Sequence, residues 1–202
     1  MTAFLPILML DEHRLAPSFG YVFNADWHNP HESIVTLLWK YVRGNAIAGH
    51  VVVSDIARKA IDPYGGIEAY REAIDVSRLK SALGLSRSIL NEALIPARRR
   101  GATDPSFRYC PSCLSRGYHS VVHQFAMVRR CPIHDLRLET ACRRCGYSAP
   151  YRLTARLLES PFVCPQCHRR YGIWHPNSRH RYLMPMKDLM PIRRMHIAYG
   201  RY

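Results

Sequence analysis

Cys110-Pro111-Ser112-Cys113 is the first of four short motifs that decide how this 202-residue chain folds. The others are Cys131-Pro132-Ile133-His134, Cys142-Arg143-Arg144-Cys145 and Cys164-Pro165-Gln166-Cys167. Together they use all seven cysteines of the chain and one histidine. Two donors separated by two residues can point at one metal ion from a tight turn, and two such turns complete a tetrahedron. The spacing therefore predicts two structural Zn²⁺ ions.

Disulfide bridges are the alternative, but one histidine that completes a set with seven cysteines fits metal better. Seven residues separate the second motif from the third, which favours pairing consecutive motifs over a cross-brace in which alternate motifs share an ion. Each set then has four protein donors, so no position remains for a reacting water. The expected metal ligands are Cys110, Cys113, Cys131 and His134 in one site, and Cys142, Cys145, Cys164 and Cys167 in the other.

Neighbouring residues agree with this interpretation. Three motifs carry proline after their first cysteine, which fixes a backbone torsion of the turn, and Gly146 can adopt the left-handed conformation. His119 and His123 lie four residues apart and could replace a ligand, but we expect them at the surface or in contact with nucleic acid. His168 is also expected not to be a ligand.

Charge divides the chain into two unequal halves. The formal net charge is +14, and residues 1–95 carry −1 whereas residues 96–202 carry +15. Of the 20 basic residues in the second half 19 are arginines, whose planar guanidinium pairs with phosphate through two hydrogen bonds. Nucleic acid is therefore the expected partner. The alternatives are a basic surface that only keeps the protein soluble and one that docks an acidic protein. The candidate phosphate contacts are Arg87, Arg98, Arg99, Arg100, Arg129, Arg130, Arg143 and Arg144.

The first half reads as an extended arm followed by helices. Residues 1–28 alternate short apolar pieces with proline and glycine, as an arm or edge strand does. Asn29-Pro30-His31-Glu32 predicts a helix start, because Asn caps helices and Pro suits their first position. Apolar residues from Ile34 to Val42 follow at helical spacing, and Gly44 ends the stripe. A second helix is expected over residues 67–76.

Residues 78–94 have the pattern of a helix-turn-helix. Gly84 suits the turn, Ser86 suits the cap of the second helix, and Arg87 and Ser88 would then face DNA. Lys80 fits poorly, because such motifs place a small buried residue there. An ordinary helical hairpin explains the same apolar pattern, so both interpretations stay open.

The domain organisation follows from these patterns. Pro96 to Gly101 brackets three arginines and is expected to be a hinge. Three prolines in residues 174–202 make long helices unexpected there, and its methionines are expected to pack in a core. We therefore expect an extended arm (1–28), a helical region (29–100), a double zinc-binding domain (101–172) and a basic tail (173–202). The expected fold class is a small α+β protein with two zinc-ribbon or knuckle modules.

Several classes of protein are excluded by the sequence. The longest apolar stretch, Ala3 to Leu10, is too short to span a bilayer and contains Pro6. No secretory signal is apparent at the start, so a reducing cytoplasm is the expected location. The chain has no phosphate-binding Gly-Lys-Ser/Thr loop and only five carboxylates after residue 95, so we expect no catalysis.

The cysteine region also resembles a known family. The stretch 107–113 (Phe-Arg-Tyr-Cys-Pro-Ser-Cys), followed by 131–138 and 142–146, resembles the TniQ family (TnsD/TniQ) of transposition target-selection proteins, and the likeness extends over about residues 20–170. The resemblance implies the two zinc sites given above. Many relatives continue into a second helix-turn-helix region, for which little room follows Tyr171, so sequence-specific site choice is not implied.

The resemblance also implies a function and partners. TniQ-like proteins select targets for Tn7-like transposons, bind DNA or a guide-RNA effector complex, and recruit an AAA+ ATPase regulator. We therefore expect a zinc-containing, DNA-associated adaptor without enzymatic activity, with a homodimer left open. A zinc-ribbon scaffold that binds only protein and a helix-turn-helix transcription regulator are the alternatives.

Overall fold

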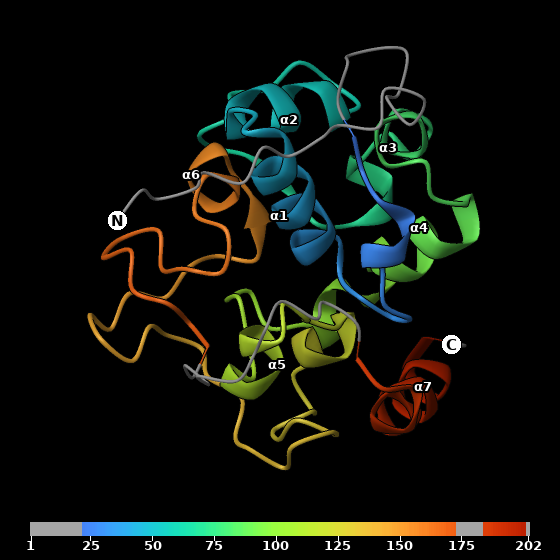
Figure 1. The fold of residues 1–202 in the computed structure, drawn as a ribbon, viewed down its shortest axis with the longest axis vertical. Coiled ribbons are helices and arrows are strands. Elements are labelled where there is room, and N and C mark those ends of the chain that lie inside the picture. The colour runs from blue at the N-terminus through green and yellow to red at the C-terminus, as the bar shows by residue number, and fades with distance from the viewer. Residues whose placement is uncertain (1–21, 173–183, 201–202) are drawn as a thin grey trace, which may run out of the picture.

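The computed structural model describes residues 22–172 and 184–200. Its fold is a small α+β arrangement, mostly helical, with one antiparallel pair of short strands (Figure 1). The α-helices are α1 (Ile34–Asn45), α2 (Gly49–Ile56), α3 (Val76–Leu83), α4 (Arg87–Ala93), α5 (Pro111–Ser115), α6 (Ala155–Leu158) and α7 (Met186–Gly200). The strands are β1 (Ile67–Glu68) and β2 (Arg152–Leu153), and the 3-10 helices are η2 (Ala25–Trp27), η3 (Arg71–Ala73), η4 (Ala97–Ala102) and η5 (Val121–Gln124).

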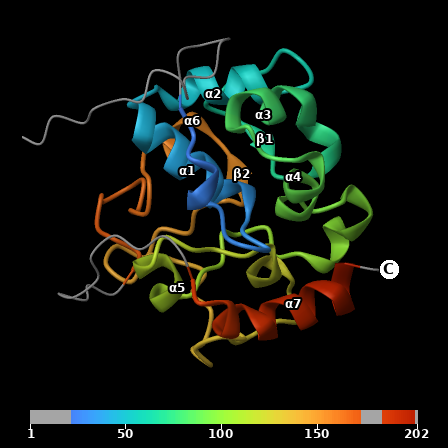
Figure 2. The ribbon, with the colours of Figure 1, turned by 45° about the vertical axis from the view of Figure 1, so that its right-hand side comes forward.

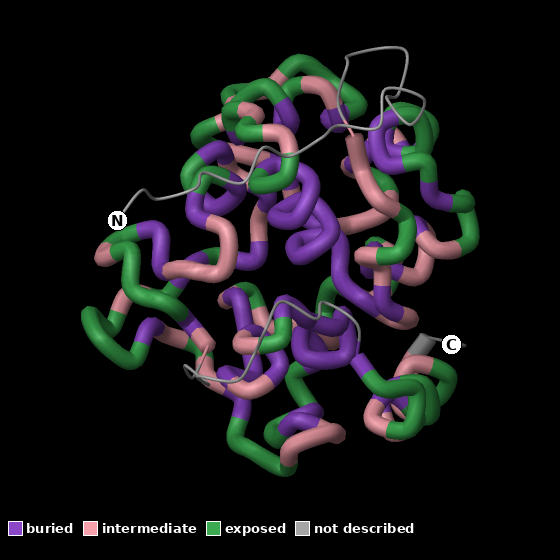
Figure 3. Tube along the Cα trace, in the orientation of Figure 1, coloured by how far each residue is buried: buried purple, intermediate pink, exposed green. Residues whose placement is uncertain are grey.

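Helix α1 is the centre of the core. Its residues from Ile34 through Val42 are all buried, and Figure 3 shows this segment enclosed by the surrounding chain. The indole N–H of Trp39 donates to the carbonyl of Leu157 in α6 at 2.7 Å. A helix buried on every side needs neighbours all round, so α1 fixes the positions of the elements packed on it.

Two charged side chains are buried beside this helix. Lys40 lies 2.6 Å from the carboxylate of Glu32, and both side chains are at most 1 % exposed. The same carboxylate accepts a hydrogen bond from the backbone N–H of Asn29 at 2.9 Å. Burial of a charge is tolerated when it is paired and hydrogen-bonded, so this pair anchors the entry to α1.

The hydrophobic core formed by the described residues consists of two clusters. The first takes residues from α1 to α4, both strands and α6, together with Cys142 and Cys164. The second contains Cys110, Cys113 and Cys131, and α7 adds Leu189 and Ile192 to it, packed against η5 (Figure 2). The segments 29–100 and 101–172 both contribute to the first cluster.

The start of α1 differs from the expectation. Asn29 is not the helix cap, because His31 takes a left-handed conformation (φ 58°) that ends the turn, and Ser33 precedes the first helical residue. The helix also continues through Gly44 to Asn45 and ends at Ala46, whose φ is 50°. The local signals marked the region of the helix but misplaced its ends.

The helix expected over residues 67–76 is absent from the described structure. Ile67 instead pairs with Leu153 in the antiparallel sheet, and η3 follows. The side chain of Asp75 then accepts hydrogen bonds from the backbone N–H groups of Ser77 and Arg78, which starts α3. Strand pairing with a distant segment and this cap together override the helical spacing.

The helical pair formed by α3 and α4 lies where the pattern of residues 78–94 indicated. Gly84 joins the two helices with φ 64°, and the Ser86 hydroxyl accepts from the N–H of Ile89 at 3.3 Å. Leu79 and Leu90 are fully buried. Lys80 is exposed, so it does not disturb the packing between the helices.

The expectation that the tail has no long helix was wrong, because it contains the 15-residue helix α7 with Pro191 inside it. The segment expected to be a hinge forms the 3-10 helix η4, and its role as a hinge stays a prediction. A proline inside a helix removes one hydrogen bond, but Leu189 and Ile192 beside it are at most 1 % exposed. Their burial offsets that loss. Met184 is buried whereas Met186 is 63 % exposed. Residues 173–183 and 201–202 of the predicted tail lie outside the described part.

Candidate metal centres and arginine surface

The first four-donor group lies where α5 meets the loop after Val128. The Nδ1 atom of His134 is 3.3 Å from the Sγ of Cys113, 3.6 Å from that of Cys110 and 3.7 Å from that of Cys131. The sulfurs of Cys113 and Cys131 are 3.6 Å apart. All three cysteines are at most 1 % exposed. Consecutive motifs therefore share this group.

These separations match the edges of a zinc tetrahedron. Zn–S bonds of about 2.3 Å and Zn–N bonds of about 2.0 Å place two sulfurs about 3.8 Å apart and a sulfur and a nitrogen about 3.6 Å apart. A disulfide would bring its sulfurs to about 2.05 Å. The four donors of this group can hold a metal ion.

The second four-donor group has the same dimensions at a more exposed place. The sulfurs of Cys142 and Cys167 are 3.7 Å apart, as are those of Cys145 and Cys164. Cys164 is fully buried, whereas Cys145 is exposed. This group can also hold a metal ion, and four thiolates are a typical structural zinc set.

Three of the four motifs are built as the same turn. The residue after the last donor takes a left-handed conformation, at Asp135 (φ 50°), Gly146 (φ 73°) and His168 (φ 55°). Backbone N–H groups then point at sulfur, as that of Arg144 does toward Cys142 at 3.4 Å. The first motif differs because Cys110 precedes α5 with Pro111 at the first helical position.

Thiol chemistry in the first group favours a bound cation. Hydrogen bonds with Cys110 and Cys113 lower the pKa of the Cys131 thiol well below its usual range. Hydrogen bonds with Cys110 and Cys131 raise the pKa of His134 to about 9. The Cys131 thiolate thus stabilises positive charge on His134, whereas hydrogen bonds with Cys110 and Cys131 raise the pKa of the Cys113 thiol. A bound Zn²⁺ would supply the positive charge that thiolates at all these positions require.

Two histidines behind the first group are buried, which corrects their expected surface position. His119 and His123 are both 0 % exposed. The Nε2 of His123 lies 3.7 Å from the Sγ of Cys131, and the Nδ1 of His119 lies 2.7 Å from the hydroxyl of Ser33. They sit behind the metal donors rather than on a nucleic-acid surface, because the ring of His119 packs against Phe107.

The eight candidate arginines do not form one continuous site. Arg100, Arg130 and Arg143 pair with the carboxylates of Glu68, Asp135 and Glu139 respectively. Arg98, Arg129 and Arg144 are exposed and form no ion pair among the described residues. Arg87 donates to the Ser77 hydroxyl at 3.0 Å, and Arg99 is half-buried in η4.

Two further arginines beside the second group were not among the eight candidates. Arg169 and Arg170 follow Cys167 and are exposed. One pair of adjacent arginines, Arg143 and Arg144, thus lies within the motif of Cys142 and Cys145, and a second pair follows the motif of Cys164 and Cys167. Like Arg143 and Arg144, Arg169 and Arg170 are adjacent arginines in the strongly basic second half of the chain, so the same charge argument could have selected them.

One comparison with known proteins finds a match, to a family model that covers the first four-donor group. No curated protein matches the chain. None of the helices in the described ranges has the length and hydropathy needed to span a bilayer.

The TniQ family model matches residues 29–138, which include α1 to α5 and the first four-donor group but not the second. Because the match covers more than half of the sequence, the chain belongs to the TniQ family.

Proposed function

We propose that this protein is a zinc-containing, DNA-associated targeting adaptor of a Tn7-like transposon. Membership of the TniQ family implies a role in Tn7-like transposition, where family members act as adaptors rather than as known enzymes. The adaptor would link target DNA, or a guide-RNA effector complex, to an AAA+ ATPase regulator. The observation that carries the proposal is the first four-donor group inside the family match.

The metal would serve structure. Cys110, Cys113, Cys131 and His134 would hold one ion, and the four cysteines from Cys142 to Cys167 would hold the other. Each ion would cross-link two loops that have little regular secondary structure. With four protein donors at each ion, neither would retain a position for substrate.

Arginines around the second group support contact with phosphate. Arg144, Arg169 and Arg170 are exposed, and none of them forms an ion pair within the described ranges. A guanidinium that has no carboxylate partner can pair with a phosphate without losing an existing contact. These three are therefore better candidates than Arg130, whose partner Asp135 lies 2.8 Å away.

Salt dependence of duplex binding tests the nucleic-acid part. The logarithm of the association constant should fall linearly with the logarithm of the salt concentration. The triple variant Arg144→Ala, Arg169→Ala and Arg170→Ala should bind more weakly and show a shallower slope. Arg130→Ala is the matched control and should change little. Absence of duplex binding at low salt would contradict the proposal.

Co-purification tests the adaptor part. A partner AAA+ ATPase from the same mobile element should be retained by this protein, and target DNA should increase the amount retained. Retention that is the same with and without DNA would instead support a scaffold that binds only protein. The scaffold function is favoured by the ion pairs of Arg100 with Glu68 and of Arg143 with Glu139, because these two arginines would have to give up a carboxylate partner to bind phosphate.

A further inference from the structure

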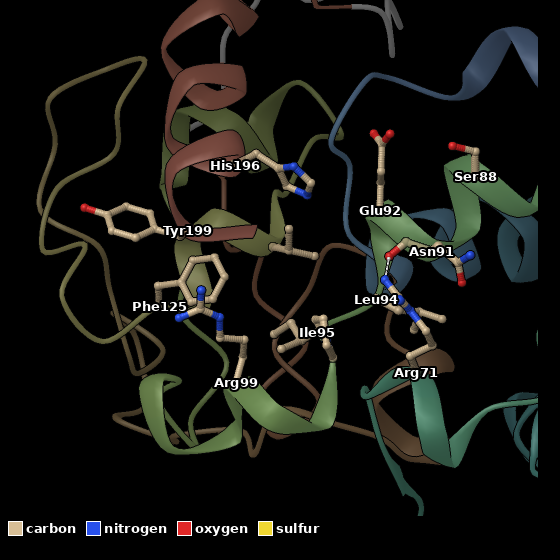
Figure 4. Close-up of a pocket in the computed structure, with 12 residues that line it drawn as sticks. Arg71, Ser88, Asn91, Glu92, Leu94, Ile95, Arg99, Phe125, His196 and Tyr199 are labelled. Carbon is tan, nitrogen blue, oxygen red and sulfur yellow. Dashed lines mark hydrogen bonds between the residues drawn. The ribbon is translucent and has the colours of Figure 1, made fainter. Parts of the chain in front are cut away.

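A cavity separates α7 from the helical region. It has a volume of about 180 Å³ and lies between η3, α4, η4 and α7 (Figure 4). Basic groups come from Arg71 and Arg99, and the aromatic ring of Phe125 forms part of the wall. Neither the metal donors nor the exposed arginines of the proposed DNA surface line it.

Arg99 brings unsatisfied donors to this cavity. Its Nε and Nη2 atoms are buried and make no hydrogen bond to any described residue. Arg71 adds a third unsatisfied donor, since its Nη2 donates to the carbonyl of Asn91 at 2.9 Å but its Nε has no partner among the described residues. Buried N–H groups of a guanidinium are costly to leave unpaired. Three guanidinium N–H donors at this cavity therefore lack a hydrogen-bond acceptor among the described residues.

The charge of the lining is also unbalanced. Among the described residues that line the cavity, Glu92 is the single carboxylate. It forms no ion pair with either arginine, and its Oε2 lies 3.4 Å from Nδ1 of His31, which is not part of the lining. His196 of α7 faces Glu92 (Figure 4), and burial lowers the pKa of this histidine below its ordinary value of 6.5. At neutral pH the lining therefore carries a net charge of +1, which one monovalent anion would balance.

The shape of the cavity restricts what that anion can belong to. The unpaired nitrogens of Arg99 are buried, so a rigid DNA duplex cannot bring its phosphates onto them. Leu94, Ile95 and Phe125 provide an apolar wall next to the guanidinium groups. A narrow group that joins a planar carboxylate to an apolar part matches both features, because carboxylate and guanidinium form two parallel hydrogen bonds.

We propose that this cavity binds a carboxylate of a partner protein, offered at its C-terminus or on an acidic side chain next to an apolar group. The interaction goes beyond the proposed DNA contact and uses different arginines. It would place the partner against both α7 and α4, which belong to different hydrophobic clusters. An adaptor that joins a protein to DNA needs separate surfaces for the two.

Nuclear magnetic resonance of arginine Nε–H groups in the full chain tests this proposal. The probes are N-acetyl-phenylalanine, which has a free carboxylate and an aromatic ring, and its uncharged amide. The Arg99 signal is assigned by its absence from Arg99→Lys. We expect the carboxylate to shift the Arg99 signal saturably and the amide to leave it unchanged.

Variants add a direction to the test. Arg99→Lys removes the guanidinium fork and should weaken binding about tenfold, followed through the Arg71 signal. Its matched control is the exposed neighbour Arg98→Lys, which should bind as the wild type does. Glu92→Gln removes the opposing negative charge and should strengthen binding, so an Arg99 variant that fails to fold leaves the proposal testable.

Three further probes identify the source of the carboxylate or overturn the proposal. Binding of N-acetyl-glutamate α-amide in preference to N-acetyl-phenylalanine would assign the site to an acidic side chain, and the reverse preference would assign it to a C-terminus. Equal binding of the carboxylate and its amide would refute the proposal. So would a shift of Arg99 caused by inorganic phosphate or a short DNA duplex but by neither carboxylate, or no shift with any probe.

Discussion

Replacing Cys113 by serine tests whether the first four-donor group holds α7 in place. The sulfur of Cys113 is fully buried and lies 3.6 Å from that of Cys131. A serine hydroxyl is a poor ligand for Zn²⁺ at neutral pH, so the group should lose its metal. The surrounding cluster contains three of the seven cysteines together with Leu189 and Ile192 of α7.

The size of the effect follows from this composition. Structural zinc contributes on the order of 10 kcal/mol or more, which is comparable to the whole stability of a domain. The second cluster should therefore not persist without its metal. A free helix of 15 residues is marginal in water, so α7 should melt. Because α7 holds about a quarter of the described α-helical residues and the short helix α5 contains Cys113 itself, ellipticity at 222 nm should fall by at least about a quarter.

Zinc content and circular dichroism of the same samples provide the assay. Wild-type protein should bind two zinc ions per chain, and Cys113→Ser should bind one and lose the helical signal of α7. The control is Cys145→Ser in the second group, where the cysteine is exposed. That variant should also lose one ion but keep α7. The reasoning is refuted if both variants lose the same helical signal, or if Cys113→Ser keeps two ions.

Other expected outcomes concern stability. Glu32→Gln removes the carboxylate that faces the buried charge of Lys40 and should lower the free energy of unfolding, measured with urea, by about 3–5 kcal/mol. The double variant Glu32→Gln with Lys40→Met should regain most of that stability. Gly66→Ala should destabilise by about 2 kcal/mol, because φ is +68° and the new Cβ would strike the Leu153 carbonyl. Burial lowers the pKa of His119 and keeps it neutral in the folded state, so the free energy of unfolding should decrease as pH falls below about 6.5. The decrease should reach at most about 1.4 kcal/mol per pH unit. In the variant His119→Gln the dependence of the unfolding free energy on pH should be weaker.

Spacing predicted the two four-donor groups because their construction is local. Each motif forms one turn, and the left-handed residue after it, Gly146 for example, follows from a short stretch of sequence. Pairing of consecutive motifs was indicated by the loop between His134 and Cys142. The chemistry of thiol and imidazole donors thus needs little information from the rest of the chain.

Elements that depend on distant partners were predicted less well. Pro191 argued against a helix in the tail, yet the burial of Leu189 and Ile192 against η5 stabilises α7. Ile67 forms a strand because Leu153 lies opposite it. In both cases the deciding contact joins segments far apart in the sequence, and local propensity contains no information about it.

The buried histidines show why the metal groups and the helical region cannot be treated separately. His123 contacts the sulfur of Cys131, and the rings of His123 and His119 lie 5.1 Å apart. His119 in turn meets the hydroxyl of Ser33, the residue that precedes α1. A polar path therefore connects a candidate metal ligand to the start of the central helix. Since α1 is buried on all sides by the first cluster, loss of the metal should loosen the first turn of α1 while the remainder of this helix stays folded.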